Sequence, residues 1–294
     1  MPKRVAPTVR LAASGHNREA RLRQAFAPQV RLAWAAGAAG RQERAFAPSV
    51  RLAVAGPATA LERGLSAAES APALLVSYVY LAQFQRSRSK YHFRDWVMDS
   101  GAFSAANSGT EIKLDDYIAK CQELLASDDK LSEVFGLDVI GNPTASRRNV
   151  EAMWKAGVQA IPTFHVGSPW AELKSLCADY PKIALGGMVG RTAAVKDRFI
   201  GEAFSRVWPH RIHGFGIGGE RLIMKYPFHS VDATNWEMAP TAFGAWAAYG
   251  GAQLSIRGGS QNLRVEVEHY LRIEARARDR WASEWARIEA GKSE

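Results

Sequence analysis

From about residue 72 onward, short apolar runs alternate along the chain with segments whose apolar residues recur every three or four positions. A short apolar run is typical of a buried strand, and the longer spacing is typical of a helix with one buried face. This alternation predicts eight strands. They are Leu74–Tyr80, Trp96–Asp99, Val134–Val139, Val158–Phe164, Lys182–Gly186, Ile212–Gly216, Ser230–Asp232 and Ala252–Ile256.

Amphipathic segments lie between these runs. In residues 115–125 the apolar side chains share one face, and Ser168-Pro169 begins another helix, because proline is favoured at the first helical position. A long helix is predicted over residues 261–290. Strands that alternate with helices in this way predict an α/β fold, and eight such units predict a (β/α)8 TIM barrel.

Polar residues follow several of the predicted strands, as a barrel with an active site at the carboxyl ends of its strands requires. Asp99, Asp138, His165 and Asp232 all occupy such positions. A doubly wound sheet would also place its site at strand ends. The pattern therefore favours a parallel α/β fold more firmly than it favours closure of the barrel.

Residues 1–70 have a different composition. The motif Ala-Pro-x-Val-Arg-Leu-Ala begins at Ala6, Ala27 and Ala47, in segments rich in Ala, Arg and Pro that would form a poor core. We predict a disordered basic arm over residues 1–70 and a catalytic barrel with a C-terminal helix over residues 71–294. The arm could bind phosphates, serve as an Arg-rich transit peptide, or be a tail without a folded role.

The net charge of +9 is concentrated in this arm. Residues 1–70 hold eleven Lys or Arg and four acidic residues, which leaves the rest of the chain close to neutral. A strong field for nucleic acid would therefore come mainly from the arm.

The composition also limits the class of protein. No apolar run approaches the roughly 18 residues that span a bilayer, so we expect no membrane partner. Cys121 and Cys177 are the only cysteines, and we expect both to be buried thiols. Two cysteines cannot build a zinc site of three or four thiolates from one chain, and they provide no disulfide framework, which fits a cytoplasmic protein.

The segment Asp99-Ser100-Gly101-Ala102-Phe103-Ser104 is the strongest candidate for chemistry. It follows the apolar residues Trp96–Met98, so it places a carboxylate at the end of a strand. The small residues after Asp99 would let the backbone approach a flat ligand closely. Taken alone, the same residues also make ordinary turns.

Asp232 ends a later strand in Ser230-Val231-Asp232 and could be a nucleophile, a metal ligand or a general base. A capping role in the loop after the strand is the plainer alternative. With Asp99 at the end of another strand, a shared site becomes the better interpretation.

Two further features are less specific. Gly186-Gly187-Met188-Val189-Gly190 follows a strand and could present its backbone to a ligand, hold a phosphate, or be a tight turn. His165, His213 and Asp232 could form a metal site, although hydrogen-bonding histidines in the barrel wall are the more common case.

Taken together, these strand-end residues resemble the tRNA-guanine transglycosylase family, and more closely its phage and bacterial branch that inserts 7-deazaguanine bases into DNA. Asp99-Ser100-Gly101-Ala102-Phe103-Ser104 resembles the family's Asp-Ser-Gly-Gly-Phe-Gln. Residues 186–190 resemble its glycine-rich turn, and Val231-Asp232 resembles the strand end that carries its nucleophile. The three matches occur in the family's order across residues 75–260.

The resemblance implies an exchange of guanine for a 7-deazaguanine base through a covalent intermediate on Asp232, with Asp99 as general acid and base. It implies no metal and no other cofactor. The implied base-binding residues are Ser100, Gly101, Phe103, Asp138, His165, Gly186, Gly187 and Met188. Exposed arginines that could contact phosphates are Arg147, Arg148, Arg191 and Arg257.

The chain departs from the family pattern at Ala102 and Ser104, and its two cysteines cannot form the zinc site with which the tRNA enzymes grip tRNA. We therefore expect a barrel without the zinc subdomain, with DNA as its substrate, in a bacterial or phage-infected cell. The chain could also form a homodimer. The alternatives are the same chemistry on tRNA, a metal-dependent barrel hydrolase, and a non-catalytic nucleic-acid-binding protein that acts through its arm.

Overall fold

The computed structural model describes residues 49–54, 71–90, 92–233, 245–248, 252–255 and 259–290. Among these residues, eight parallel strands form one curled sheet in the order β4-β3-β2-β1-β8-β7-β6-β5. The strands of the sheet are β1 (Ser49–Val54), β2 (Ala73–Ser77), β3 (Trp96–Asp99), β4 (Leu131–Val134), β5 (Thr163–His165), β6 (Lys182–Gly186), β7 (Arg211–Gly214) and β8 (Ser230–Ala233).

The two outer strands of this order meet and close the sheet. Ile161, just before β5, donates its N–H to the carbonyl of Val134 at 2.9 Å and accepts from the N–H of Gly136 at 2.9 Å. A parallel bridge between Phe135 and Ile161 joins the same two segments. The predicted α/β fold is therefore confirmed, and it is TIM-barrel-like.

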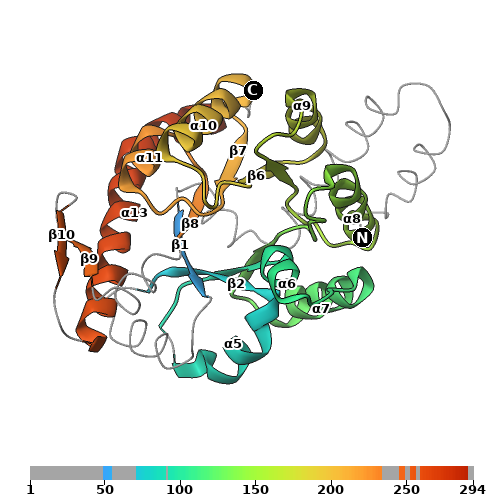
Figure 1. Ribbon diagram of the computed structural model, residues 1–294, viewed down its shortest axis with the longest axis horizontal. Coiled ribbons are helices and arrows are strands. Elements are labelled where there is room, and N and C mark those ends of the chain that lie inside the picture. The colour runs from blue at the N-terminus through green and yellow to red at the C-terminus, as the bar shows by residue number, and fades with distance from the viewer. Residues whose placement is uncertain are drawn as a thin grey trace.

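Helices follow the strands and cover the outside of the sheet, as the ribbon in Figure 1 shows. The helices are α5 (Leu81–Ser87), α6 (Ala102–Ser108), α7 (Leu114–Ser127), α8 (Pro143–Lys155), α9 (Trp170–Asp179), α10 (Ala193–Val207), α11 (Glu220–Lys225) and α13 (Gly259–Ala290), with short 3-10 turns at Tyr78–Tyr80 and Arg88–Lys90. The amphipathic segments predicted from the sequence correspond to α7, α9 and α13.

The side chains of each strand alternate between two apolar layers, because successive side chains point to opposite faces of the sheet. Val50, Leu52 and Val54 of β1 belong to the large core between sheet and helices. Ala53 and Leu75 belong to a separate cluster of six buried residues, which also contains Val97, Phe135, Ile161 and Ala184. This smaller cluster fills the middle of the barrel and separates its two ends.

The first strand of the barrel lies inside the segment predicted as a disordered arm. Residues 49–54 are buried throughout and pair with β2 on one side and β8 on the other. The boundary at residue 70 was therefore wrong for these six residues, which include most of the third repeat. The remainder of the arm, residues 1–48 and 55–70, lies outside the described residues.

The last predicted strand does not join the barrel. Ala252–Ser255 forms β10, which pairs antiparallel with β9 (Ala245–Ala248) in a separate two-stranded sheet. The count of eight barrel strands was thus right, but β1 takes the place that the prediction gave to residues 252–256. The strands predicted over 134–139 and 158–164 were also displaced, and occur at 131–134 and 163–165.

Ion pairs fill the end of the barrel where the strands begin. The guanidinium of Arg51 donates to Asp95 Oδ1 at 2.6 Å, and the ammonium of Lys182 lies 2.6 Å from Glu133 Oε2. Burial alone would raise the pKa of Asp95, but the charges of the neighbouring arginines outweigh it and lower the pKa to about 2. Burial lowers the pKa of Lys182 to about 8, against the opposing effect of Glu133.

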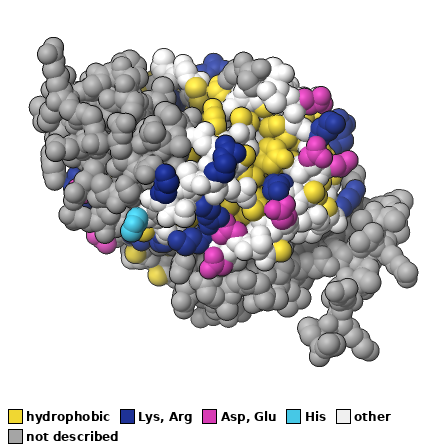
Figure 2. Space-filling model, turned by 90° about the horizontal axis from the view of Figure 1, so that it is seen from below, with side chains coloured by type: hydrophobic (Ala, Val, Ile, Leu, Met, Phe, Trp, Pro, Cys, Tyr) yellow, Lys and Arg dark blue, Asp and Glu magenta, His cyan; other side chains and the backbone are white. Residues whose placement is uncertain are grey.

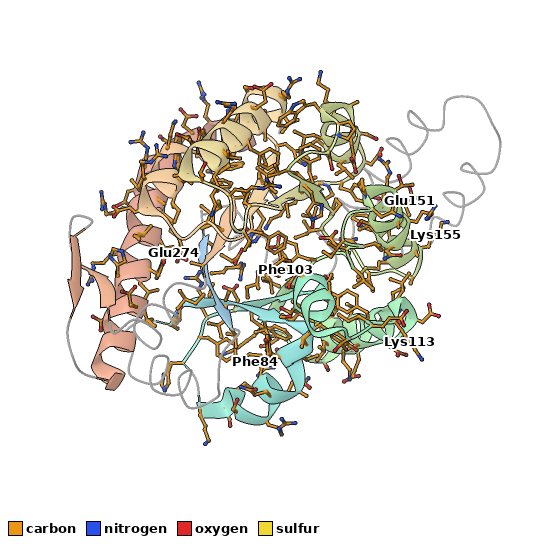
Figure 3. All side chains as sticks on the ribbon, in the orientation of Figure 1. Phe84, Phe103, Lys113, Glu151, Lys155 and Glu274 are labelled. Carbon is orange, nitrogen blue, oxygen red and sulfur yellow. The ribbon has the colours of Figure 1, made fainter. Side chains whose placement is uncertain are left out.

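The C-terminal helix is tied to the first strand by Glu274. Its carboxylate accepts from the N–H of Val50 at 2.9 Å and pairs with Arg94 at 2.9 Å and Arg278 at 2.8 Å. Figure 3 labels Glu274 on α13, where that helix passes β1. This contact gives the N–H of Val50, near the start of β1, its hydrogen-bond acceptor.

The two cysteines differ in burial, and the helices were also compared with what a bilayer requires. Cys121 is buried, as expected, whereas Cys177 is only partly buried. In the described part of the chain, no helix combines the length and the apolar composition needed to cross a bilayer.

Candidate active site

Asp99 lies at the carboxyl end of β3, as the sequence predicted. Its Oδ2 accepts a hydrogen bond from the N–H of Gly101 at 3.0 Å, which folds residues 99–101 into a tight turn. Gly101 adopts φ +74°, and a Cβ there would lie 2.5 Å from Ser77 Oγ. The turn therefore needs glycine, both for its backbone conformation and for the close approach of β2.

Asp232 is the third of the four residues of β8, and only 5% of its surface is exposed. Its Oδ1 accepts from the N–H of Gly216 at 2.9 Å and lies 3.4 Å from Nε2 of His213. Nδ1 of His213 is 2.9 Å from the hydroxyl of Ser230. The imidazole is completely buried and packs against the rings of Phe135 and Phe215, whose centroids each lie 4.7 Å from its own.

The pKa values of both carboxyl groups are raised, and the charge of Asp232 contributes to the shift of Asp99. Burial raises the pKa of Asp99 to about 7, opposed by the hydrogen bond from Gly101 and reinforced by the negative charges of Asp232 and Asp138. Burial also raises the pKa of Asp232 to about 7, opposed by the hydrogen bond from Gly216. At neutral pH, one carboxyl group can therefore hold a proton while the other is ionised, which is the state that acid–base chemistry at pH 7 requires.

His213 does not supply a positive charge to this pair. Burial lowers the pKa of its imidazole well below the usual value, and the charges of Lys182 and Arg51 act in the same direction. The neutral ring therefore orients Asp232 by contact and does not neutralise it.

Asp138 and His165 form a second unit at the same end of the barrel. Asp138 lies in the loop four residues beyond β4, and not at the end of a strand over residues 134–139 as predicted. Its Oδ2 is 3.3 Å from Nε2 of His165, the last residue of β5. Burial would lower the pKa of His165, but the hydrogen bond to Asp138 and the charges of Asp138 and Glu172 raise it.

The glycine-rich turn after β6 makes room for this histidine. A Cβ on Gly186 would lie 3.1 Å from Cδ2 of His165 and 2.7 Å from the methyl group of Thr163. Gly187 adopts φ +75°, and the side chain of Met188 is buried in the outer core, so only its backbone could meet a ligand. The turn thus brings its backbone against His165, while Gly187 itself is exposed and its backbone could meet a ligand.

The remaining base-binding candidates differ in exposure. Ser100 is 2% exposed, whereas Phe103 in the first turn of α6 is 56% exposed and is labelled beside that helix in Figure 3. Other exposed apolar side chains also follow strands at this end, namely Val79, Val139, Ile140 and Val189. The mouth of the barrel is therefore lined by carboxyl groups and bordered by apolar side chains.

The four candidate phosphate contacts do not form one group. Arg147 is engaged with Asp179 and Ser175, while Arg148 and Arg191 are exposed. Arg257 lies outside the described residues. On the face shown in Figure 2, which is Figure 1 seen from below, Lys and Arg side chains gather near the centre.

Sequence reasoning missed several polar groups of this mouth. Ser77 Oγ, Thr163 Oγ1, His213 Nε2 and Asp138 Oδ1 are buried without a hydrogen-bond partner. Ser77 is paired in register with Asp99. A small polar residue at an inward position of an apolar strand is the signal that could have identified Ser77 and Thr163.

The alternative metal site is not assembled. His213 contacts Asp232, but His165 pairs with Asp138 instead. Within the described ranges, no three His, Cys, Asp or Glu side chains lie where they could hold one ion.

No protein-family model and no curated protein matches this chain. Among solved structures, it is similar to a putative fructose-1,6-biphosphate aldolase from Coccidioides immitis, with 12% identity, a TM-score of 0.40, and coverage of 87% of this chain and 92% of that one. It is also similar to the YdjI aldolase from Escherichia coli K12, with 8% identity, a TM-score of 0.30, and coverage of 82% and 92%. Likenesses this distant do not indicate what the chain does, and the assignment of the fold rests on the strand pairing.

Proposed function

We propose that this chain is a base-exchange transglycosylase that replaces guanine in DNA with a 7-deazaguanine base. The observation that carries the proposal is the pair Asp99 and Asp232. Asp99, which is partly buried, and Asp232, which is buried, lie near the ends of β3 and β8, and desolvation of both carboxyl groups raises the pKa of each to about 7. A reaction that needs one carboxylate nucleophile and one carboxylic acid at the same pH is served by such a pair.

In the first half of the proposed reaction, the ionised carboxylate of Asp232 attacks the sugar C1′. A bond forms between carboxylate oxygen and C1′ as the bond from C1′ to the guanine nitrogen breaks. The protonated carboxyl group of Asp99 transfers its proton to the departing base. The hydrogen bond from Gly216 and the contact with His213 orient the nucleophile.

In the second half, Asp99, now ionised, removes a proton from the incoming base. The base nitrogen attacks C1′, and Asp232 leaves as a carboxylate. Asp138 and the backbone around Gly187 would bind the edge of either base, and exposed Phe103 would contact its face. A target base in duplex DNA would have to leave its stack to reach this mouth.

The proposal is tested by incubating the full chain with a labelled 7-deazaguanine base and either duplex DNA or tRNA. Wild type should label DNA, and Asp232→Asn and Asp99→Asn should each lose the label by at least about a hundredfold. Without an incoming base, wild type should form a denaturant-resistant adduct with DNA that Asp232→Asn cannot form.

Asp116→Asn, which changes an exposed carboxylate in the first turn of α7, is the matched control and should retain full activity. Labelling of tRNA alone would replace DNA by tRNA as the substrate. Labelling of neither nucleic acid, or unchanged labelling by Asp232→Asn, would refute the proposed chemistry.

A further inference from the structure

A histidine and a serine lie together in the otherwise apolar middle layer of the barrel. His213 on β7 is in register with Ser230 on β8 and with Ala184 on β6, which belongs to the inner cluster of six buried residues. His213 is completely buried, and Ser230 is 1% exposed. Burying an imidazole in such a layer costs free energy unless its two nitrogens find partners.

The two ring nitrogens of His213 face different side chains. Nδ1 lies 2.9 Å from Ser230 Oγ, and Nε2 lies 3.4 Å from Asp232 Oδ1. The second distance is longer than an ordinary N–H···O hydrogen bond of about 2.7–3.2 Å, and Nε2 has no hydrogen-bond partner among the described residues. A shift of a few tenths of an ångström would close this bond. His213 therefore holds an unused hydrogen-bonding atom against the proposed nucleophile.

The hydroxyl of Ser230 decides which nitrogen of the ring carries the proton. Its only hydrogen-bond partner in the described part of the chain is Nδ1 of His213. If Nδ1 accepts from this hydroxyl, the ring proton is on Nε2 and faces Asp232 Oδ1, so every hydrogen has an acceptor. With the proton on Nδ1, the hydroxyl would lack an acceptor and the lone pair of Nε2 would face a carboxylate. The Nε2–H tautomer is therefore favoured whenever Asp232 is ionised.

The groups around the ring keep it neutral. Burial lowers the pKa of His213, and the charges of Lys182 on β6 and Arg51 on β1 lower it further. The charge of Glu133 on β4 acts in the opposite direction but is outweighed. A neutral ring can donate a hydrogen bond to Asp232 without adding a positive charge that would make the carboxylate a weaker nucleophile.

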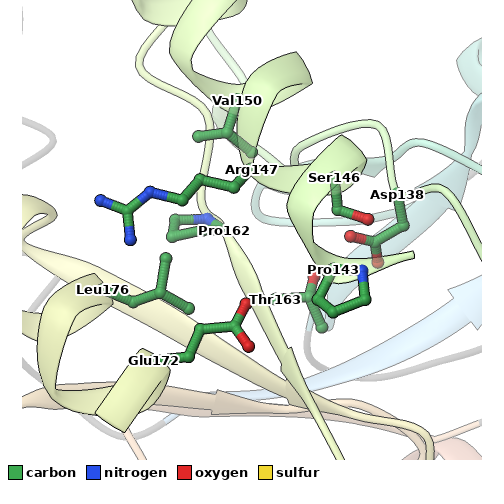
Figure 4. A pocket seen from close by; sticks show the side chains of 9 residues that line it. All are labelled: Asp138, Pro143, Ser146, Arg147, Val150, Pro162, Thr163, Glu172 and Leu176. Atoms are coloured by element: carbon green, nitrogen blue, oxygen red, sulfur yellow. The ribbon is translucent and has the colours of Figure 1, made fainter. Parts of the chain in front are cut away.

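The other carboxyl–histidine pair of the mouth has a different character. Asp138, which Figure 4 shows near Thr163, lies 3.3 Å from the partly exposed His165. Burial would lower the pKa of His165, but the hydrogen bond to Asp138 and nearby negative charges raise it. Asp138 thus faces a ring that can become an imidazolium, whereas Asp232 faces a ring that stays neutral while the carboxyl group gains and loses its charge.

We propose that His213 is a positioning residue for Asp232, with its proton on Nε2, and that Ser230 selects this tautomer. The inference rests on the proposed transglycosylase function. In the second half of that reaction, the bond from C1′ to the base nitrogen forms, and the bond from C1′ to the Asp232 oxygen breaks with its electron pair on the carboxylate. Nε2–H of His213 then closes on Oδ1 as the negative charge returns. No proton leaves His213 in this step, so the ring stays neutral.

The first measurement needs no nucleic acid. Full-length protein labelled with 15N-histidine is examined by NMR at about pH 8.5, above the pKa of Asp232 of about 7, and correlations between ring protons and ring nitrogens identify the protonated nitrogen. The signal of His213 is the one missing from His213→Gln, and its contacts with the rings of Phe135 and Phe215 give the same assignment if that variant fails to fold. Wild type should show the Nε2–H tautomer, and Ser230→Ala should show a mixture of both tautomers.

The second measurement follows DNA labelling across pH by wild type, His213→Gln and His213→Phe. Gln keeps an N–H donor near the position of Nε2, whereas Phe keeps a ring and has no donor. His213→Phe should lower kcat about tenfold or more, leave the KM for the base unchanged, and move the acidic limb of the pH profile up by about one unit, because ionised Asp232 loses a donor. His213→Gln should recover most of each effect. His92→Gln, at an exposed histidine before β3, is the matched control and should behave as wild type does.

An Nδ1–H tautomer or an imidazolium at His213 in wild type would overturn the proposal, and so would a wild-type pH profile in His213→Phe. An unchanged tautomer in Ser230→Ala would overturn the role of Ser230. Loss of packing alone would lower the amount of active protein without moving the pH profile. Failure of DNA labelling would refute the proposed function and leave the tautomer measurement standing, whereas an Nδ1–H tautomer in an active enzyme would refute this inference alone.

Discussion

Replacing Asp232 by Asn should remove a loss of stability that the wild-type protein undergoes as the pH rises, because the wild-type carboxyl group is held in a site that disfavours its charge. The pKa of Asp232 is about 7 in the folded protein, against an ordinary value of 3.8. The folded state therefore binds this proton more tightly than the unfolded state does. Its stabilising effect is complete below pH 3.8 and is lost as the pH rises to about 7.

The size of the effect follows from these two values. Each pH unit between them is worth about 1.4 kcal/mol, so the wild-type protein should lose about 4 kcal/mol of unfolding free energy from this group between pH 4 and pH 8. Asp232→Asn has no such group and should not show this loss. Removing the Asp232 charge also relieves Asp99, whose pKa it helps to raise, so the curve of the variant should be flatter still.

The assay is urea unfolding of wild type and Asp232→Asn at intervals from pH 4 to pH 8, with Asp116→Asn as an exposed control. The difference between Asp232→Asn and wild type should grow by about 4 kcal/mol over this range, while the control should run parallel to wild type. Curves for Asp232→Asn and wild type that stay parallel within about 1 kcal/mol would show that burial does not hold Asp232 neutral.

Two single substitutions and one pair of substitutions test the frame of the site. Gly101→Ala should cost about 1–3 kcal/mol in chemical denaturation, because its backbone has φ +74° and a Cβ would lie 2.5 Å from Ser77 Oγ; an unchanged midpoint would contradict this turn geometry. Glu274→Ala should cost about 3–5 kcal/mol and expose α13 to proteolysis, because it leaves Arg94 and the start of β1 without their acceptor. Lys182→Met should cost about 3–5 kcal/mol, and adding Glu133→Leu should recover most of it; additive losses would mean that the pair is not coupled.

The sequence predicted most of the barrel because its strands are short apolar runs that face a helix layer. Trp96–Asp99 and Lys182–Gly186 were located to the residue, and the strand predicted at 230–232 differs by one. Asp99 and Asp232 were located because each ends such a run. The signal is local in every case, since it depends only on the burial of neighbouring positions along one strand.

The first strand could not be recognised in this way. Residues 49–54 lie in a segment rich in Ala, Arg and Pro, and include Arg51, which a local criterion assigns to solvent. Arg51 can be buried because Asp95, 44 positions away, accepts a hydrogen bond from it at 2.6 Å. Glu274, from the far end of the chain, accepts a hydrogen bond from the N–H of Val50 in the same strand. A contact between residues so far apart leaves no periodic trace in the sequence.

The sequence by itself determined that this is a parallel α/β chain with carboxyl groups at the ends of its strands. Only the tertiary structure decided which runs make up the eight strands, and that Asp99 and Asp232 lie close enough for the charge of one to raise the pKa of the other. It also decided that His165 pairs with Asp138 while His213 lies beneath Asp232. The physical reason is that burial, pKa and pairing depend on groups from separate strands, which come together only when the sheet closes.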